Sequence, residues 1–407
     1  MASAQGPSAP VPPALPFRLD LDTAAVRGGR SPDPASGAIV APIHQTATFV
    51  QREVGGTPAH TYSRSSNPTV SALESALAAL EDDGGGATRA LAFRTGLAAL
   101  SALFLGLCSA GDRVVVSRVV YGGTVRLLRR VLARFELRAE FVDTSDAQAL
   151  AAALREPARL VLIETPANPT LVLTDVACAA RLARGAGALL AVDNTFLTPA
   201  GQRCLDLGAD LAVYSTTKLI EGHDATVGGA ITTRDAALQA ELAFARNALG
   251  SIQAPFDAWL TLRGLSTLPL RLRVQSAAAL EVARRLAAHP RVARVAYPGL
   301  EQHPQHALAR AQQLQHGALV AFEPAGGGAA ARALVSALRL ISPAENLGAV
   351  ESLVTHPATM THAALEPAER EALGIGDGLL RLSVGLESPA ALIADLERGL
   401  AVAGGGA

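Results

Sequence analysis

The chain has 407 residues, and its 35 basic and 36 acidic side chains leave a formal net charge of -1. This balance provides no general attraction to nucleic acid or to an anionic membrane. The three cysteines have no CxxC spacing, which excludes a disulfide framework and a cysteine zinc site and is typical of a reducing cytosol. We therefore expect a cytoplasmic protein that uses no metal and binds neither nucleic acid nor membrane.

One feature of the composition needs a chemical explanation. Of the basic residues, 34 are arginine and one, Lys218, is lysine. Arginine can replace lysine wherever a positive charge is sufficient, but a guanidinium group stays charged and cannot act as a neutral amine. We therefore expect Lys218 to serve chemistry that requires an amine.

The N-terminal part of the chain differs in composition from the rest. Residues 1–16 are rich in proline, alanine and serine, and we predict a disordered tail. Residues 17–70 are rich in glycine, proline and serine without clear periodicity, which indicates an irregular arm rather than a domain.

Residues 71–270 show short apolar runs that alternate with segments of helical period. We predict strands at 90–93, 113–117, 139–143, 160–165, 189–194 and 211–216, and helices at 96–108, 123–134 and 175–186. Strands that alternate with helices indicate a mostly parallel sheet in an α/β fold. Because the runs are apolar throughout, helices should cover both faces of this sheet.

The C-terminal part is predicted to form a smaller α/β domain at residues 271–403. A helical stretch at 254–288 spans the start of this domain, and Pro269 within it predicts either two helices or one kinked helix. Strands are expected at 292–297, 318–323 and 381–387, with helices near 304–314, 327–338 and 389–402.

Polar residues follow two of the predicted strands at the edge where open α/β sheets bind ligands. Asp193 closes one strand, and Ser215, Thr217 and Lys218 follow the next. Taken singly, each is also typical of a helix cap or a turn. Together they match pyridoxal 5'-phosphate (PLP), which needs a lysine for a Schiff base, an acid for its ring nitrogen and donors for its phosphate.

Two further residues extend this prediction. Gly96 opens a predicted helix, whose first backbone N–H groups would bind phosphate. Tyr121, in the sequence YGGT, is placed to cover the cofactor ring. The sequence contains neither GxGxxG nor GxxxxGK[ST], so dinucleotide and nucleoside triphosphate binding have no support.

At these residues the chain resembles the cystathionine γ-synthase / γ-lyase family of trans-sulfuration enzymes. The resemblance covers roughly residues 40–400 and implies PLP and the aspartate aminotransferase-like fold, the PLP-dependent transferase fold type I. It is carried by nine motifs in order: APIHQTATF (41–49), YSRSSNPT (62–69), YGGT (121–124), ETPANPT (164–170), AVDNTF (191–196), YSTTKLIEGH (214–223), AENLGAVESL (344–353), MTHA (360–363) and RLSVGLE (381–387).

The resemblance implies catalytic and cofactor-binding roles at the matching positions. Lys218 would form the Schiff base and move protons, and Asp193 would pair with the ring nitrogen. Tyr121 would stack on the ring and act as a second proton carrier. The other cofactor contacts would be Gly96, Leu97, Asn168, Ser215 and Thr217 of the same subunit, with Tyr62 and Arg64 of a neighbouring one. The contacts of Tyr62 and Arg64 require at least a dimer, and the family is usually tetrameric.

The resemblance also implies residues that bind the substrate. Arg381 would hold the α-carboxylate through a bidentate pair, and Arg126 the distal carboxylate of larger substrates. The alternatives are an ordinary strand arginine at 381 and a solvated arginine-rich helix face at 126. Glu345 matches an acid linked with chemistry at Cγ, and Asn346 stands where the family has serine.

The reaction that the resemblance favours is γ-replacement of an O-acylhomoserine with cysteine, as in cystathionine γ-synthase. The alternative is cystathionine γ-lyase, which eliminates to cysteine, 2-oxobutanoate and ammonia. Thr61 stands where family members acting on cystathionine often have an acid. This difference weakens the case for both the γ-synthase and the γ-lyase reaction. Methionine γ-lyase is less favoured because those enzymes typically have cysteine where Gly123 stands. A non-catalytic PLP-binding protein is the alternative from another class.

Overall fold

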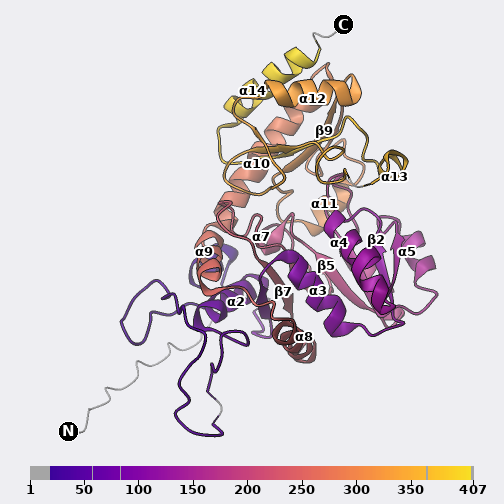
Figure 1. The fold of residues 1–407 in the computed structure, drawn as a ribbon. Helices are drawn as coiled ribbons and strands as arrows, with labels where there is room; N and C mark the ends of the chain where they lie inside the picture. Colours follow the sequence, from indigo (N-terminus) through magenta and orange to yellow (C-terminus); the bar gives the residue numbers. More distant parts are fainter. Residues whose placement is uncertain (1–18, 57, 83, 364, 405–407) are drawn as a thin grey trace.

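The computed structural model describes residues 19–56, 58–82, 84–363 and 365–404, so the predicted tail at 1–16 lies outside the described residues. Two β-sheets organise the chain, a larger one formed by its first part and a smaller one formed by its C-terminal part (Figure 1). This arrangement agrees with the α/β architecture predicted from the sequence.

The larger sheet has seven strands. Their order is β1 (Arg89–Phe93), β7 (Gly229–Thr233), β6 (Leu211–Tyr214), β5 (Leu189–Asp193), β4 (Leu160–Glu164), β2 (Arg113–Ser117) and β3 (Arg138–Val142). Strand β7 runs antiparallel to both neighbours, and the pairs from β6 to β3 are parallel.

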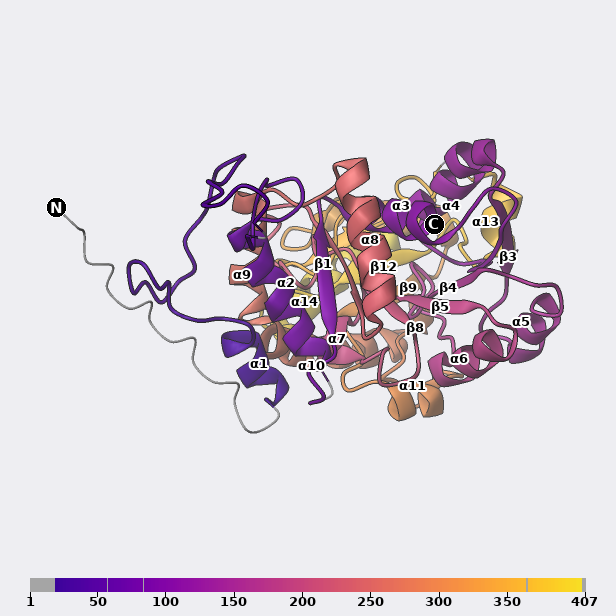
Figure 2. The ribbon, with the colours of Figure 1, turned by 90° about the horizontal axis from the view of Figure 1, so that it is seen from below.

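Both faces of this sheet are covered by helices, as the apolar strands predict. Alternate residues of one strand enter different cores: Val115 packs in one apolar cluster, whereas Val114 and Val116 pack in the other. Helices α2 (Pro68–Glu81) and α6 (Val176–Gly185) contribute to the first cluster, and α3 (Gly96–Leu107) and α8 (Ala236–Leu249) contribute to the second. Figure 2 shows helices on both sides of the sheet.

The smaller sheet carries the C-terminal part of the chain. Its order is β10 (Ser342–Pro343), β11 (Leu353–Thr355), β12 (Leu380–Ser383), β9 (Leu319–Pro324) and β8 (Val292–Ala296). Its core is shared with helices α10 (Leu268–Ala287), α12 (Gly327–Ala337) and α14 (Pro389–Ala403). The remaining α-helices are α1 (Leu21–Arg27), α4 (Gly122–Arg126), α5 (Ala147–Ala153), α7 (Thr198–Gly201), α9 (Pro255–Leu265), α11 (His306–Gln312) and α13 (Pro367–Ala372).

The stretch at 254–288 forms two helices, α9 and α10. Pro269 lies in the first turn of α10, where its missing N–H removes no helical hydrogen bond. Helix α10 contacts α7 near the larger sheet and α14 on the smaller domain, so it joins the two parts. The boundaries at residues 16, 70 and 270 stay predictions.

Several predicted elements differ from the structure. The helix expected at 123–134 is α4, followed by a π-helical turn at Leu127–Val131 and a 3-10 turn at Leu132–Phe135. The strand expected at 381–387 is β12, which ends at Ser383, the last residue paired with β9 and β11. Strands β7, β10 and β11 were not predicted, since none has an apolar run long enough to stand out.

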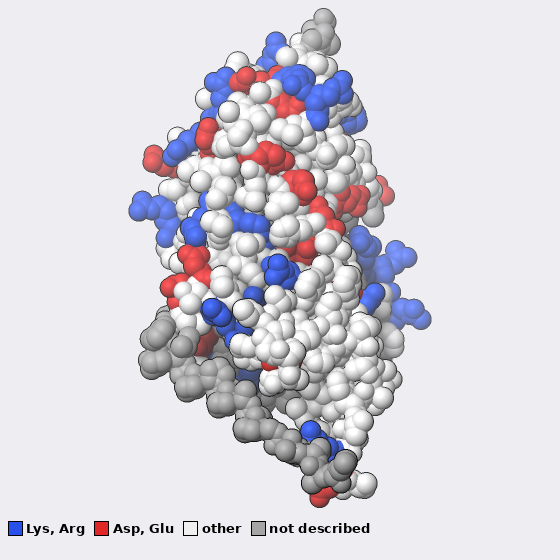
Figure 3. Space-filling model, turned by 90° about the vertical axis from the view of Figure 1, so that its left-hand side faces the viewer, with Lys and Arg blue, Asp and Glu red and all other residues white. Residues whose placement is uncertain are grey.

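No helix among the described segments is long and apolar enough to cross a membrane. Acidic and basic side chains are interspersed on the face shown in Figure 3, with few of either over its lower half. This distribution agrees with the near-zero net charge.

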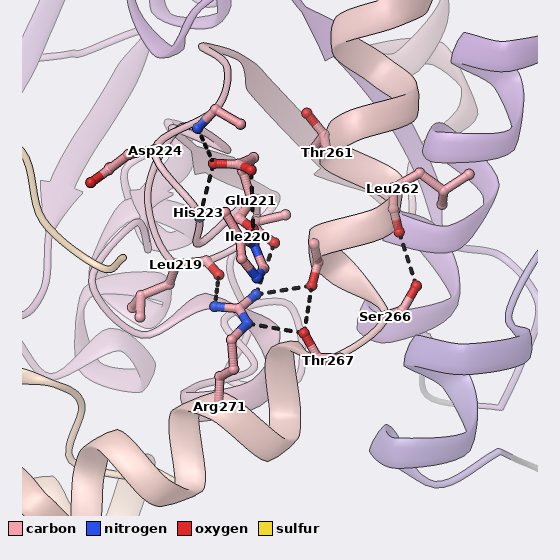
Figure 4. A network of polar contacts seen from close by, with 12 residues as sticks. Leu219, Ile220, Glu221, His223, Asp224, Thr261, Leu262, Ser266, Thr267 and Arg271 are labelled. Atoms are coloured by element: carbon pink, nitrogen blue, oxygen red, sulfur yellow. Dashed lines mark hydrogen bonds and ion pairs between the residues drawn. The ribbon is translucent and has the colours of Figure 1, made fainter. Parts of the chain in front are cut away.

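Arg271 anchors the segment that follows Lys218 (Figure 4). Its buried guanidinium donates to the carbonyls of Leu219 at 2.8 Å, Ile220 at 3.2 Å and Gly264 at 2.9 Å, and to the Thr267 hydroxyl at 3.1 Å. One arginine on α10 thereby fixes the backbone just beyond the lone lysine.

We expect Arg271→Met to lower the free energy of unfolding by about 3 kcal/mol, because it leaves several buried carbonyls without a donor. Chemical denaturation followed by circular dichroism would measure this loss. Arg285→Met is the matched control: Arg285 is exposed and pairs with Glu397, so its removal should cost no more than about 0.5 kcal/mol. Equal losses in both variants would contradict the anchoring role.

Candidate active site

A cavity of about 400 Å³ lies where the carboxyl ends of the parallel strands face the C-terminal domain. The large-domain loops and the small-domain segments around Glu345, Met360 and Arg381 both line it. The predicted site residues that line it are Gly96, Leu97, Tyr121, Arg126, Asn168, Asp193, Ser215, Thr217, Lys218, Glu345 and Arg381.

The other three predicted residues lie elsewhere. Asn346 is not part of the cavity wall but its side chain contacts Lys218. Tyr62 and Arg64 lie in the arm outside this cavity, and Tyr62 is about half exposed at 47%. Arg64 donates to the backbone and side-chain oxygens of Asn247 at 2.8 and 2.9 Å. Their predicted contact with a neighbouring subunit stays a prediction.

One end of the cavity is suited to an anion. Helix α3 begins there at Gly96, and Thr95 caps it by accepting from the Ala98 N–H at 2.9 Å. The first N–H groups of a helix have no acceptor within the helix and carry its positive dipole end. A Cβ at Gly96 would lie 2.9 Å from the Ser215 Cβ, so glycine allows this close approach of α3 to the strand end.

Two carboxylates lie side by side in the cavity wall. Glu164 of β4 is directly paired with Asp193 of β5 in the sheet register. Asp193 accepts from the Thr195 N–H at 3.1 Å, and Glu164 accepts from the N–H groups of Tyr121 at 2.8 Å and Asn168 at 2.7 Å. Burial raises the pKa of both carboxyls, and the neighbouring Asp193 helps to raise the pKa of Glu164 to about 8.

Glu164 is a site residue that the sequence reasoning did not single out. It connects the backbones of Tyr121 and Asn168, two of the predicted cofactor contacts. It stood within the ETPANPT motif at a strand end, and this position was the available signal. Its contact with Tyr121, 43 positions away along the chain, and the pairing of β4 with β5 become visible only in the fold.

Lys218 lies in the cavity wall, where burial and a neighbouring charge act on its amine. Its Nζ donates to the amide oxygen of Asn346. Burial, together with the positive charge of Arg381, lowers its pKa to about 8. A substantial fraction of a group with this pKa is a neutral amine near pH 8, which is the form that attacks an aldehyde.

Arg381 is buried and held by three contacts. It donates to the Asn168 amide oxygen at 2.8 Å, the Thr355 hydroxyl at 3.0 Å and the Asn346 carbonyl at 3.1 Å. Its Nε is buried and has no hydrogen-bond partner among the described residues. Arg381 is therefore buried, unlike an ordinary exposed strand arginine. Its Nε–H remains available to donate to an anionic ligand.

Arg126 differs from the arginines that follow it. Arg126 lines the cavity, whereas Arg129 pairs with Glu369 at 3.0 Å and lies over the Phe141 ring. Arg130 is exposed and does not line the cavity. Arg126 is exposed like Arg129 and Arg130 and differs from them in lining the cavity, so its role in substrate binding stays a prediction.

Comparison with known proteins agrees with this geometry. The model of the family described as "Cys/Met metabolism PLP-dependent enzyme" matches residues 22–401. The chain belongs to this family.

Individual relatives agree with the assignment. The chain is similar to cystathionine γ-synthase of Mycobacterium tuberculosis, at 44% identity over 93% of this chain and 96% of the relative. It is similar to cystathionine γ-lyase of Dictyostelium discoideum at 42% identity over 95% and 98%. A solved cystathionine γ-synthase of Xanthomonas oryzae pv. oryzae, in complex with aminoacrylate and cysteine, has a TM-score of 0.92 and 46% identity over 95% and 99%.

The protein is therefore a PLP-dependent enzyme of trans-sulfuration in cysteine and methionine metabolism, with the aspartate aminotransferase-like fold. Family membership speaks against the alternative of a non-catalytic PLP-binding protein. The residues present fit the cofactor: the tight approach at Gly96, the helix start and the buried Asp193 supply the features that PLP requires. A protonated ring nitrogen beside Asp193 would offset the effect of burial on its carboxyl group.

Proposed function

We propose that this enzyme joins cysteine to an O-acylhomoserine by γ-replacement, as a cystathionine γ-synthase does. The observation that carries the proposal is that Arg381 and Arg126 line one cavity. Two guanidinium groups suit a substrate with carboxylates at both ends, such as O-succinylhomoserine, because arginine binds a carboxylate in bidentate geometry. The similarity to two cystathionine γ-synthases also supports synthesis of cystathionine as the reaction.

The proposed cofactor contacts follow from the cavity wall. The first N–H groups of α3, at Gly96 and Leu97, and the hydroxyls of Ser215 and Thr217 would hold the phosphate. Asp193 would keep the ring nitrogen protonated, Tyr121 would cover the ring, and Asn168 would lie near its hydroxyl. PLP supplies a carbonyl for covalent attachment and a ring that accepts electrons from the substrate.

The remaining roles belong to side chains that bind substrate or move protons. Arg381 would bind the α-carboxylate and Arg126 the distal one. The amine of Lys218, once free, would remove the α-proton and return a proton at a later step, for which a pKa of about 8 is suitable. Glu345 lines the cavity and would lie near the Cγ end of the substrate.

We infer a homo-oligomer, at least a dimer and by analogy with the family a tetramer. The arm exposes Ile39, Val40 and Val50, and Tyr62 and Arg64 lie on the same segment, free of this chain's own cavity. Apolar side chains of this kind on a long arm favour burial against a second copy. We also infer a cytoplasmic location, because the three cysteines are free thiols.

The test is a paired assay of the PLP-loaded enzyme. With O-succinylhomoserine and cysteine, we expect cystathionine to form faster than the enzyme cleaves cystathionine supplied alone. Arg126→Gln should raise the KM for O-succinylhomoserine by roughly 10- to 100-fold, because a charged hydrogen bond contributes about 1.5–3 kcal/mol. The KM for O-acetylhomoserine, which lacks the distal carboxylate, should change little.

Two results would overturn this proposal. Rapid cleavage of cystathionine without synthesis would assign the enzyme to the γ-lyases. An equal effect of Arg126→Gln on both acyl substrates would remove the argument from the two arginines. Rapid breakdown of methionine would instead favour the methionine γ-lyase reading.

A further inference from the structure

Lys218 is the first member of a chain of side-chain contacts that leads out of the cavity. Its Nζ donates to Oδ1 of Asn346, and Nδ2 of Asn346 donates to Oδ1 of Asp224. Asp224 is exposed and does not line the cavity. In Figure 4 its carboxylate points away from the network around Arg271.

The chemistry of the three groups determines how Asn346 must lie. An ammonium group only donates hydrogen bonds and a carboxylate only accepts them, whereas an amide has a donor end and an acceptor end. Asp224 therefore holds the amide nitrogen, which leaves the amide oxygen facing the amine. The serine that the family has at this position would have to accept and donate through one hydroxyl oxygen on a shorter side chain, whereas the amide of Asn346 does so through two separate atoms.

The backbone around Asp224 is specifically built. Asp224 has a φ of 54°, in the left-handed region that a side chain other than Asn or Asp adopts at a cost of about 1–2 kcal/mol. The buried carboxylate of Glu221 accepts from the N–H groups of His223 at 3.0 Å and Ala225 at 3.2 Å, on either side of Asp224. Asp224 is therefore of a residue type that tolerates this backbone conformation, and the carboxylate of Glu221 holds the loop in it.

We propose that Asp224 is a positioning residue that acts on Lys218 through the amide of Asn346. The carboxylate orients the amide and stabilises the ammonium form of the lysine. The inference rests on the role proposed for Lys218 above, but it concerns the amine itself and can be tested without turnover.

The surrounding charges define what Asp224 must counteract. Burial and Arg381 favour the neutral amine, and Asp224 opposes them. Other titratable groups that line the same cavity are Tyr121, Arg126, Glu164, Asp193 and Glu345, and those beside Asp224 on its own loop are Glu221 and His223. In the hydrogen bonds of the described residues, the side chain of Asn346 contacts Lys218 and Asp224 and none of these other groups.

The lone lysine makes this proposal measurable. In the full-length protein freed of PLP, amine-selective methylation read by peptide mass spectrometry reports Lys218, apart from the N-terminal amine, which falls on a different peptide. Recovery of PLP binding on adding the cofactor back would show that the protein has stayed folded. The pH dependence of the labelling rate then gives the pKa of Lys218, expected at about 8 in the unmodified sequence.

Asp224→Asn keeps a residue suited to the left-handed backbone and an acceptor for Asn346, and removes only the charge. Loss of a nearby negative charge favours the neutral amine, so the pKa of Lys218 should fall by about 0.5, roughly a threefold change in proton affinity. Labelling near pH 7 should become correspondingly faster. Glu241→Gln, which removes one negative charge from the exposed surface of α8 outside the cavity, should change neither quantity.

A double variant tests whether the effect of Asp224 on the pKa of Lys218 passes through Asn346. In an Asn346→Ala protein, Asp224→Asn should lower the pKa of Lys218 by less than it does in the unmodified sequence, because only the through-space effect of the charge remains once the connecting amide is gone. The same shift in both backgrounds, or no shift in either, would overturn the proposal. A protein that shows the expected shifts but forms no Schiff base with PLP would instead refute the role proposed for Lys218 and leave the coupling to Asp224 supported.

Discussion

Lys218→Arg is expected to abolish covalent attachment of PLP and to lower turnover by roughly 10⁴-fold, the upper range for losing a positioned proton-transfer group. Arginine preserves the positive charge and much of the side-chain volume, so the variant should fold and bind PLP only non-covalently. It fails chemically because its guanidinium group cannot become the neutral nucleophile that the cavity produces from lysine.

The measurement combines spectroscopy with trapping. The variant should lack the visible absorbance of a lysine–PLP Schiff base, and borohydride should trap no adduct on the peptide that contains residue 218. Arg130→Lys is the control, because it adds an amine at an exposed position outside the cavity. Its adduct should still form on Lys218. A fully active Lys218→Arg enzyme would refute both the assignment of the site and the interpretation of the composition.

Arg381→Lys is expected to raise the KM for the amino-acid substrate about 100-fold while leaving PLP attached. The planar guanidinium group holds Asn168, Thr355 and the Asn346 carbonyl at once, and its buried Nε remains free for a ligand. A lysine ammonium cannot reproduce this planar set of donors, and losing one charged hydrogen bond, worth up to about 3 kcal/mol, accounts for an effect of this size.

Steady-state kinetics with O-succinylhomoserine would measure this loss, and the visible spectrum would show that the cofactor is retained. Arg339→Lys is a matched control, because the Arg339 side chain is exposed on the same domain. An unchanged KM in Arg381→Lys would show that another group binds the α-carboxylate. A loss of PLP rather than of substrate affinity would assign Arg381 to the cofactor site.

The sequence predicted the strands of the parallel sheet well because a strand covered on both faces must be apolar throughout. Strands β2, β4 and β5 begin at the predicted residues, and β2 also ends as predicted. The prediction was poorer where an element is short or irregular. The helix expected at 123–134 includes a π-helical turn, and hydrophobic periodicity does not distinguish this turn from an α-helix.

The candidate site also contains residues that the sequence could identify and residues that only the fold identifies. Lys218 and Asp193 could be identified in the sequence because each follows an apolar strand and because a single lysine among 34 arginines calls for an explanation. Glu164 is the first residue of the ETPANPT motif, but its pairing with Asp193 depends on the register of β4 against β5. Register describes which residues of two strands lie opposite each other, so the sequence of one strand alone does not show it.

The sequence by itself determined the chemistry of this protein: one amine, an acid and hydroxyls at strand ends, and the motifs of a PLP-dependent family. The tertiary structure decided which groups act on that amine. Arg381 meets Asn168 across 213 positions of the chain, and Asn346 meets Asp224 across 122. Burial and nearby charge set the pKa of Lys218, and both arise only when distant segments pack together.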